Sequence, residues 1–420
     1  MIKEIKKEYI ERMKNDLNSL DFEKYLNCLE LCTTHGMTIN LNILKMSSID
    51  LNYVIDKFKL IEVFKNENYA YYTYDKEKLA DFGIYPGKDP LYHAGLYYIQ
   101  EPSSAKVLSE VQFETSDIVL DLCASPGGKS IEVLYSLDKN AGGFLVSNEV
   151  NYKRVKILNS NIERMGFENV VITASKSSEL LKCFNNYFDK IIVDAPCSGE
   201  GMFRKSEEAR IQWSFSLVRS CSNIQKELLD DAYNMLKDGG ILIYSTCTFS
   251  KEEDEEVVDY LLNKYSDLEL IKMEKNYPFN SIGEGQFYSI IKKKGLSVSK
   301  TVAPKMMDLE SINVIRYGVR EYEEESIKEQ NNKGSINKKC NKKNIMKPTH
   351  ESTHINDVRF NNIVDLDDIE IYKYLKGETI KKDLNFNGYC KITYKNMGIG
   401  LAKYVNGVLK NHYPKGLRLI

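Results

Sequence analysis

Between about residue 95 and residue 295, short apolar segments alternate with segments of helical character, and this alternation constrains the fold most strongly. The apolar segments are predicted to be strands at 118–122, 143–149, 170–172, 190–194 and 240–245. Helices are predicted between them, for example at 153–165 and 222–236. Near-continuous apolar strands joined by helical crossovers are typical of a parallel sheet that is covered on both faces. Two further segments, 267–274 and 286–293, are predicted to close this sheet.

The sequence on either side of this α/β domain, which we place at 96–300, predicts further parts. Residues 1–95 combine helical segments, a tyrosine-rich stretch and several turn residues, which indicates a small α+β module. Residues 318–355 are first acidic and then lysine-rich, with little apolar content, and we expect a flexible linker there. Residues 356–420 return to apolar alternation and predict a small β-rich domain.

Composition excludes several classes of protein. The net charge of −2 argues against an overall basic binder, although a local basic groove remains compatible with it. No apolar run approaches the roughly 20 residues of a transmembrane helix, and the N-terminus lacks a signal-peptide stretch, so we expect a cytoplasmic protein. The nine scattered cysteines favour free thiols over a disulfide framework. Cys28, Cys32 and His35 cluster, but no fourth ligand is evident, and we expect no metal.

A glycine-containing loop follows the first predicted strand and opens a helix. It contains Asp121, Cys123, Ala124, Ser125, Pro126, Gly127, Gly128 and Lys129. The glycines let the backbone approach a ligand closely, and the helix N-terminus offers N–H groups to a carboxylate. The spacing matches neither the phosphate loop nor the dinucleotide fingerprint, so ATP and NAD are poorly supported. An amino-acid group fits better, with Asp121 holding its ammonium; the alternative is a plain strand-to-helix turn.

An acidic residue, Glu149, ends the second predicted strand. A carboxylate in this position can accept both hydrogen bonds of a ribose diol, as it does in dinucleotide-binding folds. Glu149 alone is a weak signal, since many strands end in Glu. Together with the preceding loop it favours an adenosyl cofactor that carries an amino acid, namely S-adenosylmethionine.

Two cysteines follow two predicted strands of the sheet. Cys197 lies in the stretch after Asp194, at the end of the fourth strand, and Cys247 follows the fifth. Ligands of open α/β sheets bind outside the carboxyl ends of the strands, so both thiols are expected beside the cofactor loop. A cysteine thiolate in such a place can act as a nucleophile. When it adds to C6 of a cytosine ring, C5 of that ring becomes nucleophilic, and Asp194 is placed to act near N3 of the same ring. The alternative is that both cysteines are ordinary buried residues.

In these stretches the sequence resembles the Nop/Sun family of RNA cytosine-5 methyltransferases, and in particular its bacterial ribosomal-RNA methyltransferase F-like branch. The matching segments are 121–129, Glu149 with Arg154, 194–199 and 245–247, with 100–105 similar to the segment before the family's cofactor loop. The ending, 409–418, looks like the PUA-like RNA-binding domain of that branch. The resemblance therefore covers most of the chain outside the linker.

The resemblance implies a Rossmann-like class I methyltransferase fold, flanked by an N-terminal RNA-binding module and a C-terminal PUA-like domain. It implies Cys247 as nucleophile, Cys197 as the thiol that assists product release, Asp194 at the cytosine, and Lys129 near the reacting base. Residues 123–129, Glu149 and Arg154 would bind S-adenosylmethionine, as would Asp121 and Asp194. Ribosomal RNA is the implied partner, and we expect a monomer. One departure is the absence of Asp from 173–178, where Ser175 or a backbone group would have to contact the adenine.

Several alternatives remain at this point. A DNA cytosine-5 enzyme would use Cys197 as nucleophile and would not need Cys247. A transfer RNA is an alternative substrate, and a non-catalytic RNA-binding ribosome assembly factor is an alternative function. Basic residues are candidates for phosphate contacts, and the abundant aromatic residues can stack on unpaired bases. The basic candidates are Arg204, Lys205, Lys403, Lys410, Lys415 and Arg418.

Overall fold

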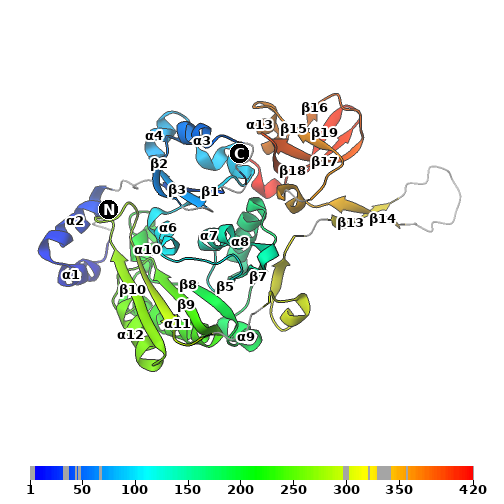
Figure 1. Cartoon of the computed structure of the whole chain (residues 1–420). Helices are drawn as coiled ribbons and strands as arrows, with labels where there is room; N and C mark the ends of the chain where they lie inside the picture. The colour runs from blue at the N-terminus through cyan, green and yellow to red at the C-terminus, as the bar shows by residue number, and fades with distance from the viewer. Residues whose placement is uncertain are drawn as a thin grey trace, which may run out of the picture.

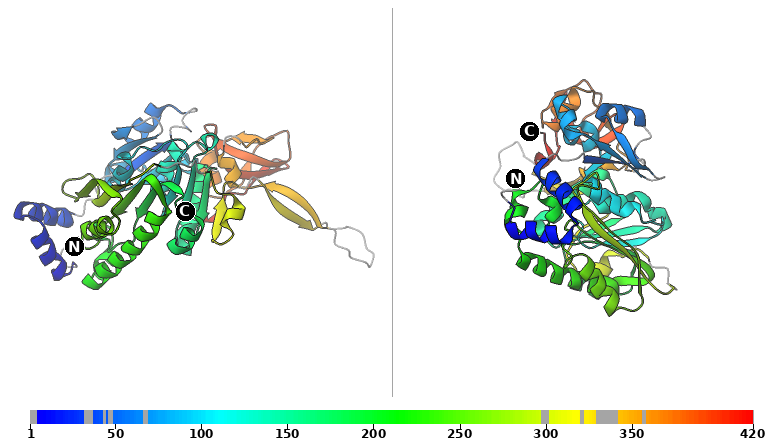
Figure 2. Two further views of the ribbon diagram at one scale, coloured as in Figure 1. Left: turned by 60° about the horizontal axis from the view of Figure 1, so that its bottom comes forward. Right: turned by 90° about the vertical axis from the view of Figure 1, so that its left-hand side faces the viewer.

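A computed structural model gives the arrangement of the chain (Figure 1). It describes residues 5–31, 37–42, 45, 49–65, 69–296, 302–319, 322–328, 342–355 and 358–419. A large central sheet with flanking helices forms the body of the molecule, and two smaller sheets, one from each end of the chain, lie together along one side of it (Figures 1 and 2). Within these ranges no helix is both long and apolar enough to cross a membrane.

The central sheet has eight strands in the order β10-β11-β9-β8-β5-β6-β7-β12. The strands are β5 (Ile118–Asp121), β6 (Phe144–Asn148), β7 (Val170–Thr173), β8 (Phe188–Asp194), β9 (Leu236–Thr246), β10 (Leu268–Asn276), β11 (Gln286–Lys293) and β12 (Val314–Tyr317). The five strands β5 to β9 run parallel, while β10, β11 and β12 are antiparallel additions at the two edges. The predicted parallel sheet and both closing strands are confirmed, whereas β12 was not predicted.

Helices cover both faces of this sheet, which explains why its inner strands are apolar throughout. They are α6 (Pro102–Ser109), α7 (Gly128–Ser136), α8 (Tyr152–Met165), α9 (Ser177–Cys183), α10 (Glu207–Gln212), α11 (Phe215–Met235) and α12 (Glu255–Lys264). Alternate residues of β5 show the two-sided burial: Val119 joins the core under α6, α7 and α8, whereas Leu120 joins the core under α9, α11 and α12.

The N-terminal part of the chain is divided between two places. Its elements are α1 (Lys7–Asp16), α2 (Ser19–Leu31), β1 (Met37–Asn42), α3 (Leu51–Phe58), β2 (Ile61–Lys65), β3 (Tyr69–Tyr74), α4 (Lys76–Asp81), α5 (Pro90–His93) and β4 (Tyr97–Gln100). The four strands form an antiparallel sheet in the order β2-β3-β1-β4. Helices α1 and α2 instead pack on the central domain, where Tyr9 and Tyr25 join Phe203, Trp213 and Phe249 in one core. This division differs from the single module predicted at 1–95.

The C-terminal part forms a five-stranded sheet in the order β15-β17-β18-β19-β16. Its elements are β15 (Ile363–Asp365), α13 (Glu370–Leu375), β16 (Ile380–Lys381), β17 (Gly388–Tyr394), β18 (Met397–Val405) and β19 (Val408–Asn411). It shares one hydrophobic core with the N-terminal sheet, so that Leu41 and Tyr97 belong to the same cluster as Ile371 and Leu375. The two ends of the chain are thereby joined into one body beside the central domain (Figure 1).

A two-stranded ribbon occupies part of the region predicted to be a flexible linker at 318–355. β13 (Tyr322–Lys328) pairs antiparallel with β14 (Lys342–Pro348), and the ribbon projects away from the rest of the molecule (Figures 1 and 2). Strands that pair only with each other satisfy their backbone groups without a hydrophobic core, so their sequence needs no apolar pattern. The lysine-rich stretch between them, up to residue 341, lies outside the described residues.

Candidate active site

The ends of four parallel strands bring the predicted site residues to one edge of the sheet. In the register of the sheet, Asp121 at the end of β5 lies opposite Ser147 of β6 and Ile192 of β8. Asp194 at the end of β8 lies opposite Ser245 of β9. The glycine-containing loop and the two cysteine loops leave from these positions, so the structure brings all of them together.

The two cysteines predicted to be catalytic are in direct contact. The sulfurs of Cys197 and Cys247 are 3.3 Å apart, and both thiols are free and partly accessible. The hydrogen bond with Cys247, followed by burial, raises the pKa of Cys197 well above that of an ordinary thiol. Either sulfur can be the donor of this hydrogen bond, and the raised pKa keeps Cys197 protonated.

Asp194 and Lys129 form an ion pair beside the thiols. The Lys129 Nζ lies 2.9 Å from Asp194 Oδ2 and donates to Ser104 Oγ at 2.7 Å. Asp194 Oδ1 accepts from Ser245 Oγ at 2.7 Å and from Gln286 Nε2 at 3.3 Å. Burial lowers the pKa of Lys129, but the charge of Asp194 outweighs it and leaves this pKa above its usual value, so the ammonium stays charged. The carboxylate side chain remains 37% exposed and can meet a ligand.

The glycine-containing loop is fixed in place by α8 and by its own backbone geometry. Gly127 has a φ of +116°, which side chains rarely tolerate, and a Cβ on Gly128 would lie 2.9 Å from Gln100 Nε2. Arg154 Nη2 donates to the carbonyl of Ser125 at 2.7 Å, while Ser125 Oγ donates to the carbonyl of Arg154 at 3.1 Å. The loop is therefore held in one shape before any ligand arrives.

Asp121 has the properties expected of a group that holds an ammonium. Its Oδ2 accepts from Ser130 Oγ at 2.7 Å, and the Ser130 hydroxyl lies 2.7 Å from that of Ser147. Its Oδ1 is buried and has no hydrogen-bond partner among the described residues. Burial raises the pKa of Asp121 to about 7. A buried carboxylate oxygen without a partner beside a helix N-terminus fits the ammonium and carboxylate of an amino acid.

The other predicted cofactor residues lie around this loop with distinct roles. Glu149 is 3% exposed; its Oε1 accepts from the backbone N–H of Asn151 at 2.8 Å, and its Oε2 lies 3.2 Å from Arg154 Nη1. The backbone N–H of Ala124 donates to the carbonyl of Asn148 at 2.8 Å, so Ala124 ties β6 to the loop. Burial raises the pKa of Cys123, which keeps this thiol neutral.

Asn148 is a site residue that the sequence did not single out. Its Nδ2 donates to the carbonyls of Leu122 and Ser175 at 3.1 and 3.0 Å, and its Oδ1 accepts from Thr173 Oγ1 at 2.8 Å. This buried amide therefore ties the ends of β5 and β7 to β6. The hydroxyl of Ser175 accepts from the backbone N–H of Asn313 at 2.9 Å, so it is already engaged where an adenine contact was considered.

A second group missed by the sequence holds the Pro-Cys loop. Glu253 is fully buried, and its Oε2 accepts from the backbone N–H of Ser198 at 2.9 Å and from Gln225 Nε2 at 3.0 Å. Gln225 also donates to the carbonyl of Pro196 at 2.9 Å. Burial raises the pKa of Glu253 to about 7. These residues lie about 30 to 55 positions apart in the sequence, where no local pattern could connect them.

The predicted phosphate contact by Arg204 is wrong. Arg204 is only 5% exposed, and its Nη1 lies 3.4 Å from Glu284 Oε2, while Lys205 lies 3.3 Å from the same carboxylate. The basic run after the Pro-Cys loop suggested a surface patch, but the fold turns Arg204 inward to neutralise a buried acid. Lys410 and Lys415, in the C-terminal domain, are exposed.

Three family models match the chain, one for each of its parts. The model described as 16S rRNA methyltransferase RsmB/F matches residues 108–296. The model of the N-terminal domain of 16S rRNA methyltransferase RsmF matches residues 5–102, and that of the methyltransferase RsmF PUA domain matches residues 361–419. The matches thus cover the N-terminal region, the central sheet and the C-terminal sheet in order.

Individual relatives agree with these models. The Ribosomal RNA small subunit methyltransferase F of Vibrio cholerae serotype O1 is 40% identical over 191 residues, which is 45% of this chain and 40% of the relative. The protein of the same name from Shewanella piezotolerans is 39% identical over 189 residues, or 44% of this chain and 40% of the relative. The aligned region therefore spans only 40% of the length of either relative.

Solved structures agree in fold. A methyltransferase homologue from Pyrococcus horikoshii has a TM-score of 0.54 at 24% identity and covers 67% of this chain and 96% of its own. NSun6 from the same organism has a TM-score of 0.56 at 20% identity, with coverage of 69% and 99%. The sheet order and these likenesses define a Rossmann-like methyltransferase fold with a C-terminal PUA domain. Residues 108–296 therefore match the RsmB/F methyltransferase family, and the regions on either side match the N-terminal and PUA domains of RsmF.

Proposed function

We propose that the protein methylates carbon 5 of a cytosine in RNA, with S-adenosylmethionine as methyl donor and Cys247 as covalent nucleophile. The observation that carries the proposal is the pair of free thiols whose sulfurs lie 3.3 Å apart at two strand ends. One thiol can add to the pyrimidine ring, and the second can handle the proton that must leave afterwards. Beside them, Asp121 Oδ1 has no hydrogen-bond partner among the residues that the structure describes, which suits the ammonium of an amino-acid group.

S-adenosylmethionine, when bound, supplies a methyl group on a positively charged sulfur. Asp121 would hold its ammonium, and the N–H groups at the start of α7, after Gly127 and Gly128, would hold its carboxylate. Glu149 at the end of β6 would accept hydrogen bonds from the ribose diol. Arg154 holds both Glu149 and the Ser125 carbonyl, so it positions the two sides of this site.

Addition to the ring is the task of Cys247 and Asp194. The Cys247 sulfur forms a bond to C6 of the cytosine, and its proton passes through the Asp194 carboxylate to N3. The C5–C6 electron pair thereby joins C4–C5, which makes C5 an enamine-like nucleophile for the methyl group. Lys129, 2.9 Å from Asp194, keeps this carboxylate in place and balances its charge.

Release of the product is the task of Cys197. After methylation C5 carries both a proton and the methyl group, and the enzyme is still bonded to C6. Cys197 gives its own proton to the departing Cys247 sulfur as it takes the proton from C5. The C5–H electrons restore the C5–C6 double bond, the C6–sulfur bond breaks, and both thiols end protonated. The proton on N3 returns through the Asp194 carboxylate to solvent, which restores the neutral base. The short contact between the sulfurs supports this exchange.

Small-subunit ribosomal RNA is the proposed substrate. The matched relatives carry ribosomal RNA small subunit methyltransferase F as their name, and the C-terminal domain matches a PUA domain. The target cytosine has to be unstacked to bring C6 against Cys247, because a stacked base hides its faces. Exposed lysines of the C-terminal domain, such as Lys410 and Lys415, suit contacts with phosphates.

The test uses tritiated S-adenosylmethionine and total RNA from a strain that lacks the gene, with 5-methylcytosine mapped by bisulfite sequencing. The unaltered protein is expected to label one small-subunit cytosine. Cys247→Ala is expected to lose activity by about 10⁴-fold or more, because it removes the nucleophile. Cys197→Ala is expected to methylate once and remain attached to RNA, which denaturing electrophoresis detects.

Cys183→Ala is the matched control, because Cys183 is a free thiol on α9, outside the site. It is expected to behave as the unaltered protein. An active Cys247→Ala together with an inactive Cys197→Ala would assign the nucleophile to the Pro-Cys loop, as in DNA-type enzymes. Absence of label in any RNA would overturn the proposal as a whole.

A further inference from the structure

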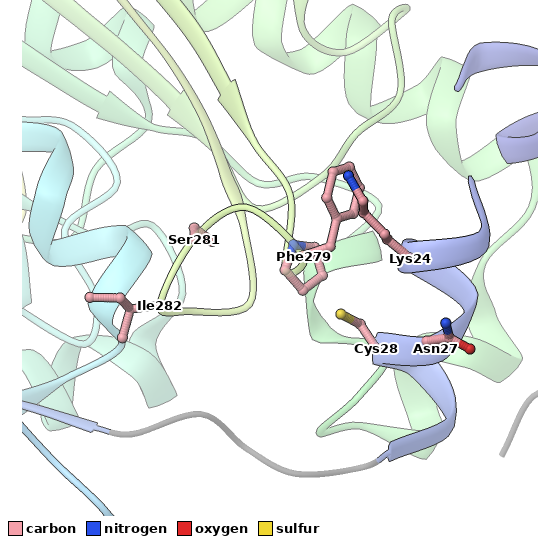
Figure 3. A pocket seen from close by; sticks show the side chains of 7 residues that line it. Lys24, Asn27, Cys28, Phe279, Ser281 and Ile282 are labelled. Carbon is pink, nitrogen blue, oxygen red and sulfur yellow. The ribbon is translucent and has the colours of Figure 1, made fainter. Parts of the chain in front are cut away.

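A pocket next to the active site lies between α2 and the loop that joins β10 to β11 (Figure 3). Its volume is about 480 Å³, within the range of roughly 300–1,000 Å³ that is usual for ligand sites. It is lined by Lys24, Asn27 and Cys28 from the helix and by Phe279, Ser281 and Ile282 from the loop. None of these residues has a part in the chemistry described above.

The pocket adjoins the catalytic groups along two chain segments. The loop that lines it ends at Gln286, whose Nε2 donates to Asp194 Oδ1 at 3.3 Å. The second segment is the cysteine loop. A Cβ added to Gly201 would lie 3.0 Å from the carbonyl oxygen of Cys247 and 3.3 Å from that of Glu284, so these two carbonyls lie close together. The loop that lines the pocket therefore also borders the backbone of Cys247 and the side chain of Asp194.

An aromatic series leads from the cysteine loop into the pocket. Phe249, two residues after Cys247, lies 4.8 Å from the ring of Tyr277 between centroids. Tyr277 stacks on Phe279 with centroids 5.3 Å apart and an angle of 8° between the rings. Phe279 ends the series inside the pocket, where Lys24 Nζ lies 5.9 Å from its ring centroid (Figure 3).

The lysine at the end of this series is weakly held. Its Nζ lies 3.1 Å from Asp21, but Lys24 is 48% exposed, and an exposed pair of this kind contributes little. Because its stem is flexible, the ammonium can move from the ring to a phosphate and leave the ring face open. Base–aromatic stacking and a cation for the backbone are the two features of sites for single-stranded nucleic acid.

We propose that this pocket binds an unpaired nucleotide that flanks the target cytosine, with its base on Phe279 and its phosphate at Lys24. The inference rests on the proposed function, since it concerns the RNA substrate of the same site. The pocket then helps to hold the strand in the unstacked form that brings the target cytosine to Cys247, which makes it a determinant of substrate choice.

The test compares variants of the full chain at Phe279. Phe279→Ala is expected to weaken binding of a 16S rRNA transcript about 10-fold in filter binding at fixed salt, because one stacking contact is lost. Phe279→Leu, which keeps apolar volume without a ring, is expected to lose a similar amount, whereas Phe279→Tyr keeps the affinity. Phe215→Ala is the matched control, because Phe215 is 44% exposed at the start of α11 in the central domain and does not line the pocket.

Three further results decide the inference. Binding of S-adenosylmethionine by calorimetry is expected to be the same in all variants, and a loss in Phe279→Leu would show a merely structural role. Equal affinity of Phe279→Leu and the unaltered protein for the transcript would overturn the subsite. An equal loss with a fully double-stranded RNA would overturn base stacking. Because filter binding does not depend on turnover, absence of methylation would count only against the proposed function.

Discussion

The catalytic edge of the sheet and the junction of the domains both bury ionisable groups, but the groups whose pKa values shift differ. At the catalytic edge burial raises the pKa values of two acids, Asp121 and Glu253, to about 7. At the junction burial lowers the pKa of His93 to about 4 and that of Lys45 to about 7, beside one acid, Glu163, whose pKa it raises to about 7. In both regions burial disfavours the charged form of the group.

The surroundings of these groups decide whether each pKa shift serves packing or ligand binding. The junction cavity, of about 80 Å³, is lined by residues from three parts of the chain, including His93, Arg164, His354 and Tyr413. His93 Nδ1 and the Tyr413 hydroxyl are 2.8 Å apart, which ties the N-terminal module to the C-terminal domain. The neutral histidines that line the junction cavity therefore contribute to packing between the domains. At the catalytic edge, by contrast, Asp121 has one oxygen, Oδ1, without a hydrogen-bond partner among the described residues, and it can regain its charge when a cation binds.

Lys129→Met should give the largest effect, because it breaks the ion pair between Lys129 and Asp194 at the catalytic edge. Lys129 is only 4% exposed, but the Asp194 carboxylate left behind is 37% exposed, so the cost falls at the low end for such pairs, about 3 kcal/mol. If this cost falls on the step that Asp194 serves, single-turnover methyl transfer slows about 150-fold. Rapid-quench measurement at saturating RNA and cofactor would show it.

An exposed ion pair provides the control for this variant. Lys264 lies 2.7 Å from Asp230 but is 43% exposed, so Lys264→Met is expected to leave the rate unchanged. Lys129→Arg, which keeps the charge, is expected to recover part of the rate. A Lys129→Met protein that is folded and as fast as the unaltered protein would contradict the role given to the pair.

Asp121 should make cofactor binding depend on pH. Its carboxyl has a pKa of about 7 in the fold, and an ammonium prefers the ionised form. Below pH 7 the proton must be lost before binding, so the Kd for S-adenosylmethionine rises about 16-fold between pH 7 and 5.5. Asp121→Asn is expected to weaken binding by about 2.5 kcal/mol at pH 7.5, roughly 70-fold, and to abolish this slope. Calorimetry across this range measures both, and a flat Kd in the unaltered protein would refute the assignment.

The parts of the site that the sequence predicted are those that lie directly after strands. Asp121, Asp194 and Cys247 could be placed together because the carboxyl ends of parallel strands meet at one edge. Asn148 and Glu253 could not be found in this way, because their partners come from distant positions and an isolated Asn or Glu carries no pattern. The sequence therefore predicted that these side chains meet, but it did not predict the residues that hold them in place.

The same reasoning explains what the sequence missed in the fold. The apolar face of α1 predicts that Tyr9 is buried but does not say against what, and its partner Trp213 lies in the central domain. β12 is a short edge strand whose pairing with β7 depends on a return of the chain after β11. Periodicity reports burial, whereas the choice of partner depends on the whole fold.

His93 allows the domain junction to be tested through stability. Its folded pKa of about 4 lies below the ordinary value near 6.5, so the unfolded chain binds the extra proton first. The contribution of His93 is fully present above pH 6.5 and is lost as the pH falls towards 4. Between pH 7.5 and 5 the loss is about 2 kcal/mol.

The buried acids oppose this trend in the same range, so the difference between two proteins is the informative quantity. His93→Gln removes the titration and retains a polar group towards Tyr413. Urea unfolding at both pH values should show the unaltered protein losing about 2 kcal/mol more than His93→Gln between pH 7.5 and 5. Equal losses would mean that His93 is protonated in the fold, and the contrast between acids at the catalytic edge and neutral bases at the junction would fail.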